Sequence, residues 1–185
     1  MKLKDLLSER KTAIVKKWFD LILQDYPADA TDFFKKQKNR FTNPVGHTIS
    51  QGIGELFEEL VHSQDSDKIC SCLDDIIRIR AVQDFSPSRA LSFIFLLKKV
   101  IREETEKEIR ENQLSGELTS LESDIDRIAL LAFDIYMKCR ERIYEIKADE
   151  VRRITFRLLQ KANLIREVKE EDLGSETVLT KNIKG

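Results

Sequence analysis

The feature that most constrains this chain is a long segment, residues 117–165, that contains neither glycine nor proline. Within it, apolar residues recur at alternating steps of four and three, a spacing typical of one face of an α-helix. They are Leu121, Ile125, Ile128, Ala132, Ile135, Cys139 and Ile146, with the polar Arg142 in the same series. The segment therefore predicts one helix of roughly 45 residues, much longer than the usual helix of a globular domain.

The second half of this predicted helix has an apolar stripe that a single domain would leave uncovered. The stripe consists of Val151, Ile154, Leu158 and Ile165. A second copy of the same helix is the simplest partner for such a stripe. We therefore predict that residues 147–165 extend the last helix and make a dimer or partner contact, and that residues 166–185, which lack periodicity, form a mobile charged tail.

Residues 1–146 are predicted to form one helical sensory domain, and two dipeptides mark helix starts within it. Asn43 precedes Pro44, and Ser86 precedes Pro87. In each pair the polar side chain can accept a hydrogen bond from a free N–H group, and proline suits the first helical position. Gly52 lies near the apolar stripe of the helix that follows Asn43, where it would allow another helix to cross closely.

Composition agrees with long helices and excludes several classes of protein. The 185 residues include only 6 Gly and 3 Pro, and 35% are charged. A formal net charge of -1 does not favour a dedicated nucleic-acid binder, which needs a basic excess. The longest apolar run, "FIFLL", is far shorter than the roughly 18 residues of a membrane span. Because the N-terminus has no signal-peptide pattern either, we expect a cytoplasmic protein.

No catalytic or metal-binding constellation stands out in the sequence. Cys70, Cys72 and Cys139 are odd in number and do not match the spacing of zinc sites or disulfide frameworks, so we expect reduced thiols. The two histidines, His47 and His62, fall away from the apolar stripe when about 100° is counted per helical residue. We therefore predict no catalytic residue, no cofactor, no haem and no metal ligand, and hence a protein that is not an enzyme.

The stretch "RAVQDFSPSRA", residues 80–90, allows two interpretations. The functional one is a polar signalling cluster, pocket or contact surface formed by Arg80, Gln83, Asp84, Ser86 and Arg89. The structural one is a helix end followed by a helix start, with Ser86 as the cap and Phe85 packed on the next helix. The structural interpretation does not require the identities of Arg80, Gln83 and Asp84, so both stay open.

Two segments carry a family resemblance: "NPVGHTISQGIGELFEELV" and "LDDIIRIRAVQDFSPSRALSFIFLLKKVIREE". They resemble the N-terminal domain of RsbRD-type RsbT co-antagonist proteins, sensory domains of bacterial stress-response signalling. The likeness runs from about Leu6 to about Arg142, and "RAVQDFSPSRALSFIF" is its most specific part. The resemblance implies a globin-like helical fold without haem, homodimerisation, and a last helix that leads to an effector domain, usually a STAS domain, in a partner-switching complex.

The combined prediction is an all-α protein with a globin-like helical bundle, without haem, and a very long C-terminal helix. We expect a non-catalytic sensory domain that forms a homodimer and contacts a signalling partner. No STAS pattern follows residue 165, so the output would pass through a partner, the dimer geometry or the extended helix. The alternative is a protein that binds a small molecule, lipid or haem in a core pocket near Phe93, Phe95 and Phe133.

Overall fold

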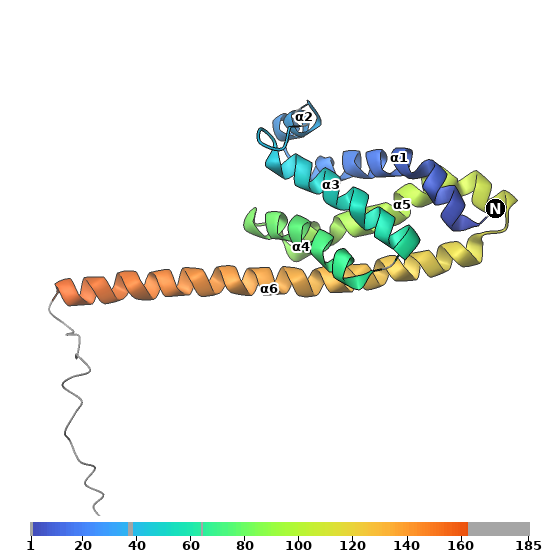
Figure 1. The fold of residues 1–185 in the computed structure, drawn as a ribbon. Coiled ribbons are helices and arrows are strands. Elements are labelled where there is room, and N and C mark those ends of the chain that lie inside the picture. The colour runs from blue at the N-terminus through green and yellow to red at the C-terminus, as the bar shows by residue number, and fades with distance from the viewer. Residues whose placement is uncertain (1, 37–38, 64, 163–185) are drawn as a thin grey trace, which may run out of the picture. The chain divides into compact units, whose positions relative to one another are not determined.

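The structure is a computed structural model that describes residues 2–36, 39–63 and 65–162. All the regular elements within those residues are helical, which confirms the all-α prediction (Figure 1). The main helices are α1 (Leu3–Ile22), α2 (Ala28–Lys36), α3 (Pro44–Glu58), α4 (Ser66–Val82), α5 (Pro87–Glu111) and α6 (Ser115–Lys161). A short 3-10 helix, η1 (Leu23–Asp25), follows α1, and a π-helical turn, η2 (Glu59–Ser63), follows α3.

The chain divides into two units, Met1–Ile143 and Tyr144–Gly185. The boundary lies within α6, whose 47 residues confirm the prediction of one very long helix. In the second unit the structure describes residues 144–162, and none of their side chains is buried. Ile165 and the predicted tail, residues 166–185, lie outside the described residues. None of the helices in the described part of the chain has the length and apolar composition needed to cross a lipid bilayer.

The interior of the first unit forms where α1 packs on α5 and α3 packs on α4 and α1. Trp18 of α1 is fully buried, and its indole N–H donates a 2.6 Å hydrogen bond to the backbone oxygen of Phe93 in α5. The two aromatic rings also stack, with their centroids 6.2 Å apart. A buried tryptophan needs such a partner for its N–H group, so this contact fixes the position of α1 on α5.

Gly52 lies where α3 and α4 cross, as the sequence predicted. A Cβ atom at this position would lie 3.0 Å from each of two side-chain atoms of Ile76 in α4. By contrast, a Cβ atom at Gly54 would meet nothing within 4 Å. The absence of a side chain at Gly52 therefore allows the two helices to approach closely.

Both predicted helix starts are confirmed. The side chain of Asn43 accepts a 2.8 Å hydrogen bond from the backbone N–H of Gly46, and Pro44 is the first residue of α3. Ser86 likewise accepts from the N–H of Arg89 at 3.4 Å, and α5 begins at Pro87. The Asn43 cap is buried whereas the Ser86 cap is exposed, so the same local chemistry serves an interior and a surface position.

The first half of α6 joins the unit through one apolar stripe and a rim of polar contacts. The buried residues of the stripe are Leu121, Ile125, Ile128, Ala129, Ala132 and Tyr136. Beside it, Glu122 pairs with Arg102 of α5 at 2.5 Å. Asp126 pairs with Lys98 of the same helix at 2.6 Å. The α6 helix thus buries fewer side chains per turn than α5 does.

Candidate functional site

Arg80, in the last turn of α4, is fully buried and lies at the centre of a polar network. Its guanidinium group pairs with the carboxylate of Asp25, at the end of η1, with an N–O distance of 2.9 Å. It also donates hydrogen bonds to the backbone oxygens of Arg89 at 2.8 Å and Ala90 at 3.3 Å. One side chain thereby joins the end of α1–η1, the end of α4 and the start of α5. We call Arg80 and its three partners, Asp25, Arg89 and Ala90, the Arg80 cluster.

Aromatic rings surround the same guanidinium group. Its central carbon lies 5.0 Å from the ring centroid of Phe85, 5.4 Å from that of Phe93 and 5.8 Å from that of Tyr26. Stacking on aromatic faces suits the planar, weakly hydrated guanidinium group and helps it tolerate burial. The Nε atom of Arg80 has no hydrogen-bond partner among the described residues. The aromatic rings are therefore the contacts that compensate for the burial of this side of the guanidinium group.

Tyr26 connects the Arg80 cluster to the turn that follows α4. Burial raises the pKa of the Tyr26 phenol above its ordinary value, which keeps the hydroxyl group protonated. This hydroxyl donates a hydrogen bond to the side-chain oxygen of Gln83 at 3.1 Å. Gln83 is therefore bound to the end of the cluster, although its side chain is exposed.

The turn at residues 83–86 is bound to α6. Asp84 adopts a left-handed backbone conformation, with φ 57°, which aspartate tolerates better than most residues. Its carboxylate pairs with Arg140 of α6 at 2.7 Å, and Arg140 also donates to the backbone oxygen of Ala81 at 3.0 Å. Tyr136 of α6 donates to the backbone oxygen of Phe85 at 2.6 Å. The turn thus lies between the Arg80 cluster and α6.

These contacts explain the residues that helix capping left unexplained. Arg80 is a buried structural residue, Gln83 and Asp84 hold the turn, and Ser86 caps α5. Arg89 donates to the backbone oxygen of Asp25 at 3.0 Å. The five residues thus take part in contacts between helices, and their role as a signalling or structural cluster stays a prediction.

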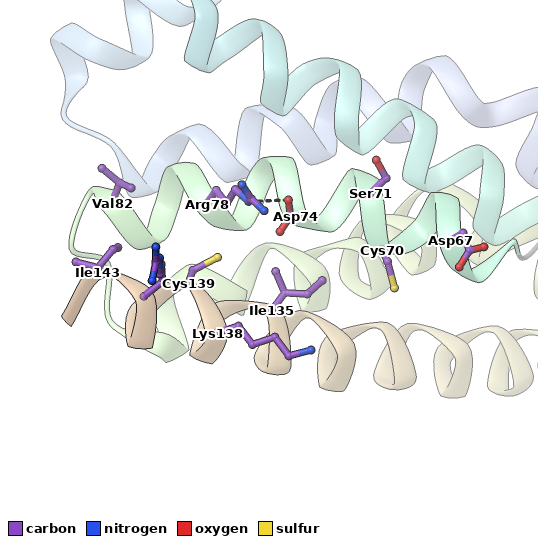
Figure 2. A pocket seen from close by; sticks show the side chains of 11 residues that line it. Asp67, Cys70, Ser71, Asp74, Arg78, Val82, Ile135, Lys138, Cys139 and Ile143 are labelled. Carbon is purple, nitrogen blue, oxygen red and sulfur yellow. Dashed lines mark ion pairs between the residues drawn. The ribbon is translucent and has the colours of Figure 1, made fainter. Parts of the chain in front are cut away.

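An open cavity of about 730 Å³ lies between α4 and the first half of α6 (Figure 2). Cys70 points into it from α4 and Cys139 from α6, near the ion pair that joins Asp74 and Arg78 at 2.6 Å. Burial raises the pKa of the Cys139 thiol, so it remains protonated at neutral pH and is a poor nucleophile. Among the described residues, no group of three or more His, Cys, Asp or Glu could hold a metal ion.

The structure does not gather the predicted pocket residues around one space. Phe93 is fully buried against Trp18, whereas Phe95 and Phe133 are 51% and 44% exposed. Phe93 and Phe95 point in different directions because two residues on a helix differ by about 200°. His47 lies half-buried at a second cavity, and His62 is exposed near the carboxylate of Glu58. In the described part of the chain the three phenylalanines thus do not face one common space, and a ligand pocket near them stays a prediction.

A face of α6 away from the buried stripe carries exposed apolar residues that are not part of the stripe predicted from the sequence. In the first unit they include Leu130, Phe133 and Met137, and Leu130 is 70% exposed. Their neighbours Ala129 and Ala132 are buried, so the exposed residues belong to a different face of the helix. The series with steps of four and three does not include Leu130 or Met137, and the seven-residue interval between these two is the sequence signal that marks them.

Comparison with known protein families gives a match over most of the chain. The family model described as the RsbT co-antagonist protein rsbRD N-terminal domain matches residues 12–151, more than half of the chain. This chain belongs to the rsbRD N-terminal domain family. The resemblance inferred from the sequence is thereby confirmed. Searches of curated proteins and of solved structures found no match to the chain.

The match places the Arg80 cluster and the turn at residues 83–86 inside the rsbRD N-terminal domain. It ends at residue 151, the first position of the stripe predicted from the sequence. In the second unit Val151, Ile154 and Leu158 are all exposed, by 62%, 50% and 60%. This stripe therefore has the exposure that a contact with another helix requires, while its use in a contact stays a prediction.

Proposed function

We propose that this rsbRD N-terminal domain is a non-catalytic sensory or regulatory module of bacterial stress signalling, and that it works in the cytoplasm as a homodimer. Family membership supports the class of pathway. The homodimer is supported by a single observation, the exposed apolar residues of α6. Leu130, Met137, Tyr144, Val151 and Leu158 follow one another at intervals of seven residues, and all are exposed.

A seven-residue interval of apolar side chains is typical of the seam between two helices of a coiled coil. Isolated apolar residues on a surface are ordinary, but a continuous exposed series on one helix marks an interaction surface. In a twofold symmetric dimer both copies would supply the same series, so no second kind of surface is needed. We therefore infer that α6 pairs with α6 of a second copy.

Signalling would proceed by a change in how α6 packs. The turn at residues 83–86 contacts α6 through Tyr136 and Arg140, so a shift of this turn would change the position at which α6 is held. Helix shifts of this kind at subunit interfaces are a common form of switching. We propose a globin-like arrangement without haem, as the family resemblance implies, and an output through a protein partner in a regulatory complex.

The dimer is tested by sedimentation velocity on the full chain at micromolar concentrations. Replacing Val151 and Leu158 together by glutamate would put four carboxylates into the paired stripe. We expect the dissociation constant of the dimer to rise by at least about 100-fold, because buried charges oppose association. The matched control is Gln160→Glu, which adds a carboxylate to the same helix away from the stripe and should leave the constant unchanged.

Each outcome of the sedimentation experiment tests a different part of the proposal. A wild-type chain that sediments as a monomer throughout the micromolar range would contradict the homodimer. A double variant that dimerises as well as the wild type would move the dimer contact away from residues 151–158. Circular dichroism of each variant shows whether α6 stays helical, so a loss of dimer can be separated from a loss of structure.

A further inference from the structure

A second cavity, about 760 Å³ in volume, lies among α1, α2 and α3. This volume falls within the range of about 300–1,000 Å³ that is usual for small-ligand sites. Val15 and Phe19 of α1 and Phe34 of α2 form its apolar wall, and all three are only partly buried. No side chain of α2 is buried, so the α2 side of this wall is not part of the buried interior of the domain.

Four polar side chains of the cavity, from α1 and α3, have no partner within the described part of the chain. They are Thr12, Lys16, His47 and Ser50, and none of them forms a hydrogen bond or ion pair with the described residues. An apolar wall next to polar groups of this kind suits a ligand with a tail and a polar head. It would suit a uniformly polar metabolite less well, because Phe19 and Phe34 would remain in contact with water.

The charges of the cavity indicate the sign of the head group. Its lining contains three lysines and one aspartate. Lys11 pairs with Glu58, and Lys35 pairs with Asp20 at 2.8 Å, so these two charges are balanced. Lys16 has no such pair among the described residues. One uncompensated positive charge beside an apolar wall matches a ligand with a single negative charge.

We propose that this cavity binds a single-chain fatty-acid carboxylate. The acyl tail packs on Val15, Phe19 and Phe34, and the carboxylate accepts hydrogen bonds from Lys16 and from a neighbouring polar side chain of α3. A carboxylic acid of this type carries one charge at neutral pH, which equals the uncompensated charge of Lys16.

The same cavity is linked to the Arg80 cluster through Phe34 and then Tyr26. The Phe34 ring meets Tyr26 edge to face, with centroids 5.3 Å apart, and Tyr26 lies 5.4 Å from Phe85. Phe85 is bound to Tyr136 of α6 through its backbone oxygen. Displacement of Phe34 by an acyl tail is thereby passed on to the turn that holds α6. This second step rests on the proposed signalling function, whereas binding itself does not.

Isothermal titration calorimetry of the full chain with decanoate, below its micelle concentration, tests the site. We expect saturable binding of one decanoate per chain, weakened by at least about tenfold in Lys16→Ala through loss of a charge-assisted hydrogen bond. Lys99→Ala, which removes an exposed lysine of α5 from outside the cavity, should bind decanoate like the wild type. Decanol, which has the same tail without the charge, should bind more weakly than decanoate by a similar factor.

Several results would overturn the proposal. They are the absence of saturable binding, equal binding of decanol and decanoate, and equal losses in Lys16→Ala and Lys99→Ala. Since Lys16 is exposed, its variant should unfold at the wild-type urea concentration, so weaker binding would not reflect misfolding. Calorimetry reports binding whether the chain is monomeric or dimeric. A negative result here and a failure to dimerise in sedimentation are therefore independent findings.

Discussion

The interior formed by α1, α3, α4 and α5 and the first half of α6 are stabilised by different interactions. The interior contains fully buried large side chains such as Trp18, Arg80 and Phe93. The α6 helix adds one narrow apolar stripe and ion pairs whose partners are partly exposed. Apolar burial contributes about 25 cal/mol per Å², whereas an exposed ion pair contributes about 0–1 kcal/mol. The interior therefore dominates stability, and a rearrangement costs least at α6.

The largest effect is expected at the centre of the interior. Arg80→Ala removes the partner of Asp25 and the donor to two backbone oxygens, and it leaves space among three aromatic rings. Breaking a buried pair in this way should lower the free energy of unfolding by about 3–5 kcal/mol. Urea unfolding followed by circular dichroism measures this change.

Arg78→Ala is the matched control, because Arg78 lies two residues earlier in α4 and its side chain is 68% exposed. Loss of its surface ion pair with Asp74 should change the free energy of unfolding by less than about 1 kcal/mol. If both variants unfold at the same urea concentration, the Arg80 cluster does not hold the interior together.

A smaller effect is expected where α3 crosses α4. Gly52→Val would place extra atoms against Ile76, and overpacking of this kind should lower the free energy of unfolding by about 1–3 kcal/mol. Gly54→Val adds the same side chain where a Cβ atom meets nothing within 4 Å, so its effect should be close to zero or slightly stabilising. Thermal unfolding of the pair measures the difference, and equal melting temperatures would show that the crossing can relax.

The sequence predicted the parts of this molecule that depend on local chemistry. The caps at Asn43 and Ser86, the close crossing at Gly52 and the length of α6 follow from residue type and spacing. It did not predict that Arg80 pairs with Asp25, because the two residues are 55 positions apart and no periodic signal joins them. Phe95 and Phe133 were expected to line a pocket, but both side chains are exposed. The rotation of each helix against its neighbours is set by packing, and sequence alone does not give it.

The smallest effect on global stability is expected at the contact between α6 and the turn at residues 83–86. Arg140→Ala removes the ion pair with Asp84 and the hydrogen bond to Ala81, which should lower the free energy of unfolding by about 1 kcal/mol. The local effect should be clearer: because α6 is held by few buried side chains, amides near residues 136–143 should exchange about fivefold faster. Hydrogen exchange followed by mass spectrometry measures this change.

Arg127→Ala is the control for that experiment, since Arg127 pairs with Asp124 within α6 and contributes nothing to the turn. It should leave exchange at residues 136–143 unchanged. Equal acceleration in both variants would mean that helix stability, and not attachment to the turn, limits exchange. A loss of global stability in Arg140→Ala as large as that in Arg80→Ala would show that α6 is part of the cooperative interior. In that case a signal could not move α6 without unfolding the domain, and the proposed switching at this turn would be wrong.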